Sequence, residues 1–148
     1  MKLKKYNKFL VAADGSAASG KTTGAKRIAK KYGLKFLSSG LLYRYAGYQL
    51  LKYRPKNKIK HLKKIFKNFD LKKLNNESLH STKISEFTSI IAKEKKIRLI
   101  LKSFQKKFAG KFKKVCIEGR DIGSVILPKA NVKFFFKCDL KTASERRY

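Results

Sequence analysis

A run of glycine, serine, lysine and threonine near the N-terminus has the composition of a phosphate-binding loop. In "DGSAASGKTTGAK" (residues 14–26), Gly15, Gly20, Lys21 and Thr22 satisfy the pattern G-x-x-x-x-G-K-[ST]. Glycine suits such a loop because the backbone must turn with positive φ and approach the ligand closely, so that its N–H groups surround phosphate oxygens. Lys21 would reach the terminal phosphates, and Thr22 would offer its hydroxyl to Mg²⁺. The pattern therefore predicts a bound nucleotide, without indicating which one.

The segments on either side of this loop are the ones that the motif requires. The apolar run "KFLVAA" (8–13) predicts a buried strand before it, and "KTTGAKRIAKKYG" predicts a helix after it that ends at Gly33. The positive end of that helix would point at the anion. A chance Gly/Ser-rich turn is the alternative, and it leaves this context unexplained. The predicted nucleotide-binding residues are Gly15, Ser16, Ala17, Ala18, Ser19, Gly20, Lys21, Thr22 and Thr23.

The rest of the chain alternates between strand and helix patterns, which indicates an α/β fold with a parallel sheet. "LKFL" (34–37) is a second strand, so the first three elements form a βαβ unit. A helix over 38–54 would be capped by Ser38 or Ser39 and end before Pro55. "KVCIEG" (114–119) and "NVKFFFKC" (131–138) are further strands, separated by a loop that holds a short helix or turn.

The middle of the chain is predicted to be helical. "NKIKHLKKIFKNF" (57–69) carries Ile59, Leu62, Phe66 and Phe69 on one stripe opposite lysines, which favours a surface helix over a membrane anchor. Residues 70–82 are polar and are expected to form a loop. Residues 83–109 predict two helices, or one bent helix, interrupted at 93–96 and stopped by Gly110.

The C-terminal residues contain the start of one more helix. "TASE" (142–145) has the capping-box spacing, with threonine at the cap and glutamate three residues later. The sequence ends one helical turn later, at residue 148. We therefore expect a fragment, or a protein that has lost its C-terminal part.

Length and composition predict one soluble, globular domain. The chain has 148 residues, of which 43% are apolar, and no apolar run approaches the roughly 20 residues that span a bilayer. The N-terminus lacks the apolar core of a signal peptide, so we expect a cytoplasmic protein with no membrane partner. Cys116 and Cys138 lie in strand-like runs without a CxxC or Cys/His grouping, which favours reduced structural thiols over a disulfide or zinc site.

A formal net charge of +30 would ordinarily suggest a nucleic-acid partner. Lysine, however, supplies 32 of the 39 basic residues and is scattered through every segment, as in a solvated, lysine-biased surface. We expect no obligatory nucleic-acid partner. Against this background arginine is informative, since its planar fork matches phosphate and carbonyl groups. The seven arginines are Arg27, Arg44, Arg54, Arg98, Arg120, Arg146 and Arg147.

Taken together, these segments resemble bacterial cytidylate kinases, which are nucleoside-monophosphate kinases, over nearly the whole chain. Four blocks carry the resemblance: "DGSAASGKTT", "LSSGLLYR", "TSIIAKEKKIR" and, most distinctively, "EGRDIGSVILPKANVKFFF". In the second block Ser38 stands where the family has an acid. The resemblance implies a three-layer αβα domain over 1–148 with parallel strand order 2-3-1-4. It also implies a monophosphate-binding region at about 38–110, a truncated lid from 139 to 148, and the absence of the family's fifth strand.

The resemblance implies transfer of the γ-phosphoryl group of ATP to CMP or dCMP, with ATP and Mg²⁺ on the loop and Thr22 as the metal ligand. A monomer is expected for the complete form. The implied catalytic residues are Lys21, Arg120, Arg146 and Arg147. The implied substrate-binding residues are Asp14, Ser39, Tyr43, Arg44, Ser89, Arg98, Arg120 and Asp121. Of these, Arg44 and Arg120 would hold the acceptor phosphate. Ser89, Arg98 and Asp121 would read cytosine, which needs an acceptor and a donor side by side.

Three alternatives remain open from the sequence. Another monophosphate kinase on the same scaffold would use a different base pocket. A P-loop binding protein without transfer activity would bind nucleotide only. A basic RNA-binding module would show affinity that falls steeply with salt.

Overall fold

The computed structural model describes residues 8–16 and 19–137, and it divides the chain into two compact units. The first unit consists of residues 1–39 together with 106–148, and the second consists of residues 40–105. The predictions for Ala17, Ala18, Cys138, Thr142, Arg146 and Arg147 lie outside the described residues.

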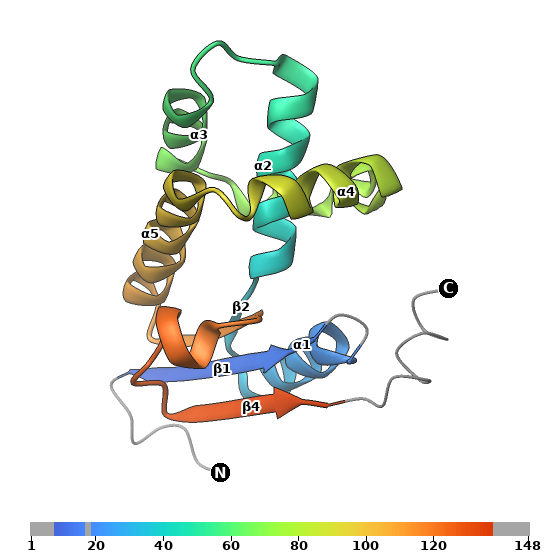
Figure 1. Cartoon of the computed structure of the whole chain (residues 1–148). Coiled ribbons are helices and arrows are strands. Elements are labelled where there is room, and N and C mark those ends of the chain that lie inside the picture. The colour runs from blue at the N-terminus through green and yellow to red at the C-terminus, as the bar shows by residue number, and fades with distance from the viewer. Residues whose placement is uncertain (1–7, 17–18, 138–148) are drawn as a thin grey trace. The chain divides into compact units, whose positions relative to one another are not determined.

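The first unit is built on a parallel four-stranded sheet (Figure 1). Its strands are β1 (Phe9–Gly15), β2 (Lys35–Ser38), β3 (Lys114–Gly119) and β4 (Val132–Phe136). Their order is β2-β3-β1-β4, and all three pairings are parallel, which confirms the predicted topology. Helix α1 (Lys21–Tyr32) follows β1, and a short π-helical turn, η4 (Ile122–Ile126), follows β3.

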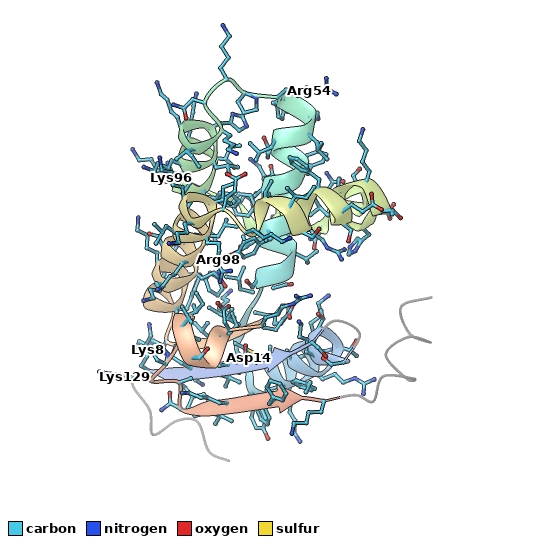
Figure 2. The ribbon with its side chains drawn as sticks, in the orientation of Figure 1. Lys8, Asp14, Arg54, Lys96, Arg98 and Lys129 are labelled. Atoms are coloured by element: carbon cyan, nitrogen blue, oxygen red, sulfur yellow. The ribbon has the colours of Figure 1, made fainter. Side chains whose placement is uncertain are left out.

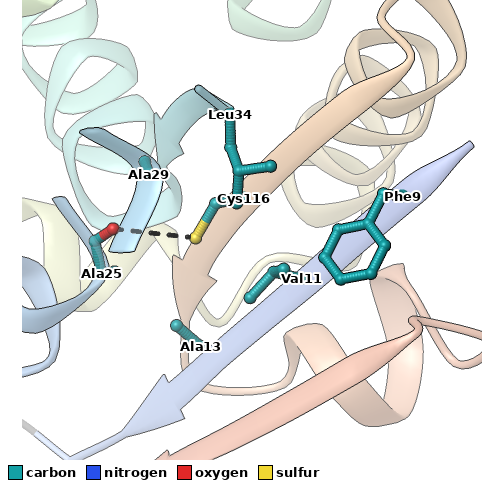
Figure 3. Packing of buried hydrophobic residues seen from close by; sticks show 7 residues of the cluster. All are labelled: Phe9, Val11, Ala13, Ala25, Ala29, Leu34 and Cys116. Atoms are coloured by element: carbon teal, nitrogen blue, oxygen red, sulfur yellow. Dashed lines mark hydrogen bonds between the residues drawn. The ribbon is translucent and has the colours of Figure 1, made fainter. Parts of the chain in front are cut away.

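One face of this sheet packs against α1. Because side chains alternate between the faces of a strand, every second residue of β1 and β3 points to the same side. The helix supplies two alanines to this contact, so its backbone lies close to the strands. Figure 3 shows Cys116 of β3 pointing toward Ala25, whose carbonyl lies 4.0 Å from its sulfur. The buried cluster consists of Phe9, Val11, Ala13, Ala25, Ala29, Leu34 and Cys116.

The second unit contains most of the predicted helices. They are α2 (Ser39–Tyr53), α3 (Lys58–Lys67), α4 (Thr82–Ile91) and α5 (Lys95–Lys111), of which α2 begins and α5 ends in the first unit. Its core includes an aromatic cluster in which Tyr45, Phe66, Phe69 and Phe104 contact one another with ring centroids 4.9–6.2 Å apart. The predicted stripe of residues 57–69 is confirmed in that Leu62 and Phe66 are buried.

The prediction of a loop over residues 70–82 was wrong. Two short 3-10 helices, η2 (Leu71–Asn75) and η3 (Glu77–His80), occupy most of this range. The side chains of Asp70 and Asn76 accept backbone N–H groups at their starts, and each turn buries one leucine, Leu74 or Leu79. Local caps therefore organise a segment whose polar composition suggests a loop.

Several boundaries also differ from the prediction. Ser38 is the last residue of β2 and directly precedes α2, and its hydroxyl donates to Glu118. Helix α5 continues through Gly110 to Lys111. The break between α4 and α5 falls at residues 92–94, which confirms two helices over this range.

Within residues 8–16 and 19–137, no helix is long and apolar enough to cross a membrane.

Strand β4 forms one edge of the described sheet, and it carries exposed aromatic side chains. Phe135 is 66% exposed and Phe134 is 39% exposed. An unpaired strand edge with apolar side chains favours association with other chains.

We expect Phe135→Lys to reduce self-association, because it puts a charge on this edge. Light scattering over a range of protein concentrations measures the effect. Leu99→Lys is the matched control, since Leu99 is 63% exposed on α5, where backbone groups are already paired within the helix. An equal effect of both substitutions would show that charge alone, and not the strand edge, governs association.

Candidate functional site

The loop between β1 and α1 needs glycine at two positions for two different reasons. Gly20, which precedes α1, adopts φ 83°, a left-handed conformation that side chains disfavour. A Cβ atom at Gly15 would lie 2.7 Å from both the carbonyl oxygen of Phe136 and Oγ of Ser19. The described part of the loop therefore fits the predicted phosphate-binding motif. Ser16 and Thr23 are exposed, and Ser19 is buried.

Lys21 folds back over the loop. Its Nζ donates a hydrogen bond of 2.7 Å to the carbonyl oxygen of Gly15. Partial burial lowers the pKa of Lys21 from its ordinary value, and the charge of Arg120 lowers it further, whereas the carboxylates of Glu118 and Asp14 act in the opposite direction. A cation that has lost part of its hydration can interact strongly with a phosphate that enters the loop.

Glu118 is a buried carboxylate at the end of β3, and it accepts two hydroxyl groups. Thr22 Oγ1 donates to its Oε1 at 3.1 Å, and Ser38 Oγ donates to the same oxygen. The residue is only 2% exposed. Its second oxygen, Oε2, has no hydrogen-bond partner among the described residues. A buried carboxylate oxygen without a partner is costly unless something pairs with it.

These groups fit a magnesium ion bound together with nucleotide phosphates. Mg²⁺ prefers oxygen ligands and usually takes only one or two from the protein, with phosphates and water supplying the others. The Thr22 hydroxyl and the nearby Glu118 carboxylate provide such oxygens. No group of three or more His, Cys, Asp or Glu side chains that could hold a metal occurs in residues 8–16 and 19–137.

Asp14 holds the segment that follows β3. Its two carboxylate oxygens accept the backbone N–H groups of Ile122 at 2.7 Å and Gly123 at 2.8 Å. Figure 2 labels Asp14, which belongs to β1. These two N–H groups directly follow Arg120 and Asp121 in the sequence. Arg120 is exposed, and Asp121 is half-buried. Asp14 therefore fixes the turn on which two predicted substrate residues stand, and its own contact with substrate remains a prediction.

The other predicted substrate residues lie on α2, α4 and α5. Ser39, the first residue of α2, is buried, and Tyr43 is half-buried. Arg44 donates to the carbonyl oxygen of Leu79 at 3.4 Å, and its guanidinium lies 3.5 Å from Nδ1 of His80. Ser89 is exposed and donates to the carbonyl of Glu86, and Arg98 is exposed on α5 (Figure 2). The second unit thus carries Arg44, Ser89 and Arg98, whereas Lys21, Arg120 and Asp121 belong to the first.

Glu118 is not among the site residues that the sequence predicts. The signal was present, because Glu118 is an acid at the end of the buried strand "VCIE", among only nine acidic residues in the chain. In many P-loop proteins an acid on a neighbouring strand helps the loop threonine to hold Mg²⁺.

A parallel sheet of this order, with a glycine-rich phosphate loop between β1 and α1, defines a P-loop α/β protein of the nucleoside-monophosphate-kinase type. The family model described as "Cytidylate kinase" matches residues 11–148. The chain belongs to the cytidylate kinase family.

Curated relatives agree with this assignment. The chain is 39% identical over 145 residues to a cytidylate kinase of Bartonella tribocorum. The aligned region covers 95% of this chain and 66% of that protein. It is 38% identical over 140 residues to a cytidylate kinase of Azorhizobium caulinodans, covering 95% of this chain and 68% of that protein. The chain spans about two thirds of the length of the curated relatives it matches.

We expect Asp14→Asn to lower the free energy of unfolding by about 1–3 kcal/mol, because a buried charge that accepts two N–H groups is replaced by a single amide oxygen. Urea unfolding followed by circular dichroism measures this. The control is Asp70→Asn, since Asp70 is exposed and accepts one N–H group. Equal losses for both variants would contradict the structural role of Asp14.

We expect Lys21→Met to raise the melting temperature of the nucleotide-free protein at neutral pH. The folded state holds the Lys21 proton less tightly than the unfolded state, so the charge costs stability at pH values below the lowered pKa. This cost disappears as the pH rises toward 10.5, the ordinary value. The difference between the two proteins should therefore shrink over that range.

Calorimetric melting at several pH values tests this, with Lys30→Met on the exposed surface of α1 as the control. A lower melting temperature for Lys21→Met at neutral pH would show that the hydrogen bond to Gly15 outweighs the cost of burying the charge.

Proposed function

We propose that this protein is a kinase that transfers the γ-phosphoryl group of ATP to CMP or dCMP, giving ADP and CDP or dCDP. The observation that carries the proposal is the set of side chains around the phosphate loop. Lys21 donates a hydrogen bond to the carbonyl oxygen of Gly15, and the Thr22 hydroxyl donates one to the buried carboxylate of Glu118. Membership of the cytidylate kinase family supports the choice of acceptor.

Phosphoryl transfer asks mainly for positioning and charge neutralisation. An oxygen of the acceptor phosphate would attack the γ-phosphorus, and the bond to the bridging oxygen of ADP would break. The loop N–H groups and Lys21 would hold the donor phosphates, with Lys21 leaving the Gly15 carbonyl to do so. Thr22 would hold Mg²⁺, which offsets phosphate charge when it is bound.

The acceptor residues are proposed from the family resemblance. Arg44 and Arg120 would grip the monophosphate, Arg146 or Arg147 would close over the transferring group, and Ser39 and Tyr43 would line the phosphate site. Ser89, Arg98 and Asp121 would read cytosine. The proposal includes a cytoplasmic location and a monomeric complete form.

A coupled assay of ADP formation against CMP, dCMP, UMP and AMP tests the proposed function, with the Lys21→Met variant as the inactive control. We expect turnover with CMP or dCMP and a loss of at least a hundredfold in the variant, since the Lys21 charge acts mainly on the transition state. ATP binding without turnover on any acceptor would identify a nucleotide-binding protein instead. Preference for AMP or UMP would identify another monophosphate kinase.

We expect Asp121→Ala and Arg98→Ala to weaken CMP binding roughly tenfold to a hundredfold while changing ATP binding little. Each removes hydrogen bonds to a buried base, which cost about 1–3 kcal/mol when one partner is lost. Calorimetric titration with each nucleotide measures this. Lys96→Ala is the matched control, because Lys96 is exposed two residues before Arg98 on α5. Equal losses of CMP and ATP affinity would place the base pocket elsewhere.

A further inference from the structure

Three elements meet at one buried carboxylate beside the phosphate loop. Thr22 comes from the first turn of α1, Ser38 from the end of β2 and Glu118 from the end of β3. Ser38 is 4% exposed and Glu118 is 2% exposed, so water screens this group of side chains little. In such surroundings hydrogen bonds influence one another more strongly than at the surface.

The strand register explains why Ser38 and Glu118 meet. β2 and β3 run parallel, and Ser38 lies directly opposite Glu118 in their register. Opposite residues on neighbouring strands present their side chains on the same face. That face is the one covered by α1, which contributes Thr22. The contact therefore follows from the sheet and does not depend on a flexible surface side chain.

Two donors share one acceptor oxygen at this point. Thr22 and Ser38 both donate to Oε1 of Glu118, and Oε2 has no partner among the described residues. If the Thr22 hydroxyl moves toward a nucleotide-bound cation, its hydrogen bond to Oε1 of Glu118 changes. The carboxylate can then rotate so that Oε2 accepts a hydrogen bond. Ser38 must then adjust, and the chain continues from it directly into Ser39 and α2.

We propose that Ser38 is a positioning residue that, through Glu118, couples nucleotide binding at Thr22 to the conformation of residues 39–44. Donor and acceptor then bind cooperatively, each raising the affinity for the other by the same factor, as linkage requires. The acceptor half of this inference rests on the proposed function. Loss of one shared hydrogen bond corresponds to a coupling factor of about three to ten.

Calorimetric titration of the full chain measures the coupling factor directly. The dissociation constant of CMP is measured with and without a saturating, non-hydrolysable ATP analogue and Mg²⁺, and the ratio is the coupling factor. We expect about three to ten for the unmodified chain and about one for Ser38→Ala, with analogue affinity changed less than twofold. Ser38→Thr keeps the hydroxyl and should retain the coupling.

The matched control is Cys116→Ala. Cys116 is fully buried on β3, two residues before Glu118 and on the same face, and its sulfur lies 4.0 Å from the carbonyl oxygen of Ala25. It should lower stability without changing the coupling factor. Equal loss of coupling in Cys116→Ala and Ser38→Ala would overturn the inference, because general loosening of β3 would explain both.

A second measurement does not depend on the acceptor. Amide hydrogen exchange of residues 39–44 is compared with and without the ATP analogue and Mg²⁺ alone. The analogue should slow this exchange in the unmodified chain and not in Ser38→Ala. A coupling factor of one, or unchanged exchange at 39–44 although the analogue binds, would overturn the inference and leave the proposed function standing. Absence of CMP binding would overturn the proposed function. In that case, unchanged amide exchange at 39–44 on addition of the analogue would also overturn the coupling.

Discussion

The parallel direction of the strands is the constraint on which this arrangement depends. Because β1, β2 and β3 run the same way, their carboxyl ends lie at one edge of the sheet, where ligands bind in open α/β folds. The registers place Ser38 opposite Glu118 and Asp14 opposite Gly119. The carboxyl end of β4 lies beside that of β1, since Phe136 pairs with Gly15. The carbonyl of Phe136 leaves no room for a side chain at position 15. Residues that are about 100 positions apart in sequence, such as Asp14 and Glu118, are thereby brought beside the loop.

That edge holds several charges that have lost part of their hydration, in a protein whose other charges are mostly exposed lysines. Burial lowers the pKa of Lys21, and Glu118 and Asp14 partly offset the effect. Each carboxylate oxygen of Asp14 accepts one backbone N–H group, whereas Oε2 of Glu118 has no hydrogen-bond partner in the described structure. The contrast assigns different tasks to the two acids. Asp14 completes the fold of the turn after β3, and Glu118 remains able to pair with something that enters the loop. Charges fixed in advance in this way lower the reorganisation that a transferring phosphoryl group requires.

The sequence predicted the elements whose signals are local and strong. The four strands, their order and the break between α4 and α5 follow from apolar runs and the family resemblance, and the structure confirms them. The partners of particular side chains decided what the sequence did not predict. Ser38 has the right type for a helix cap, and its hydroxyl also donates to a carboxylate 80 residues away, which the sequence does not indicate. Residues 70–82 look like a loop until Asp70 and Asn76 are seen to cap two short helices. Such long-range contacts and competing local caps leave little trace in composition or periodicity.

The identity of residue 38 also bears on how Glu118 is accommodated. Where the resemblance places an acid, this chain has serine, and the structure puts that position directly opposite Glu118 in a buried pair of strands. Two carboxylates there would repel each other with little water to screen them. A serine hydroxyl removes the repulsion and supplies a donor, so a single carboxylate can be held by two hydroxyls. The two methylenes of the Glu118 side chain carry its carboxylate away from the strand, so that one oxygen accepts from both Ser38 and Thr22 in the first turn of α1. Serine at 38 and glutamate at 118 therefore suit each other, because the short donor leaves room for the longer acid and the longer acid reaches both donors.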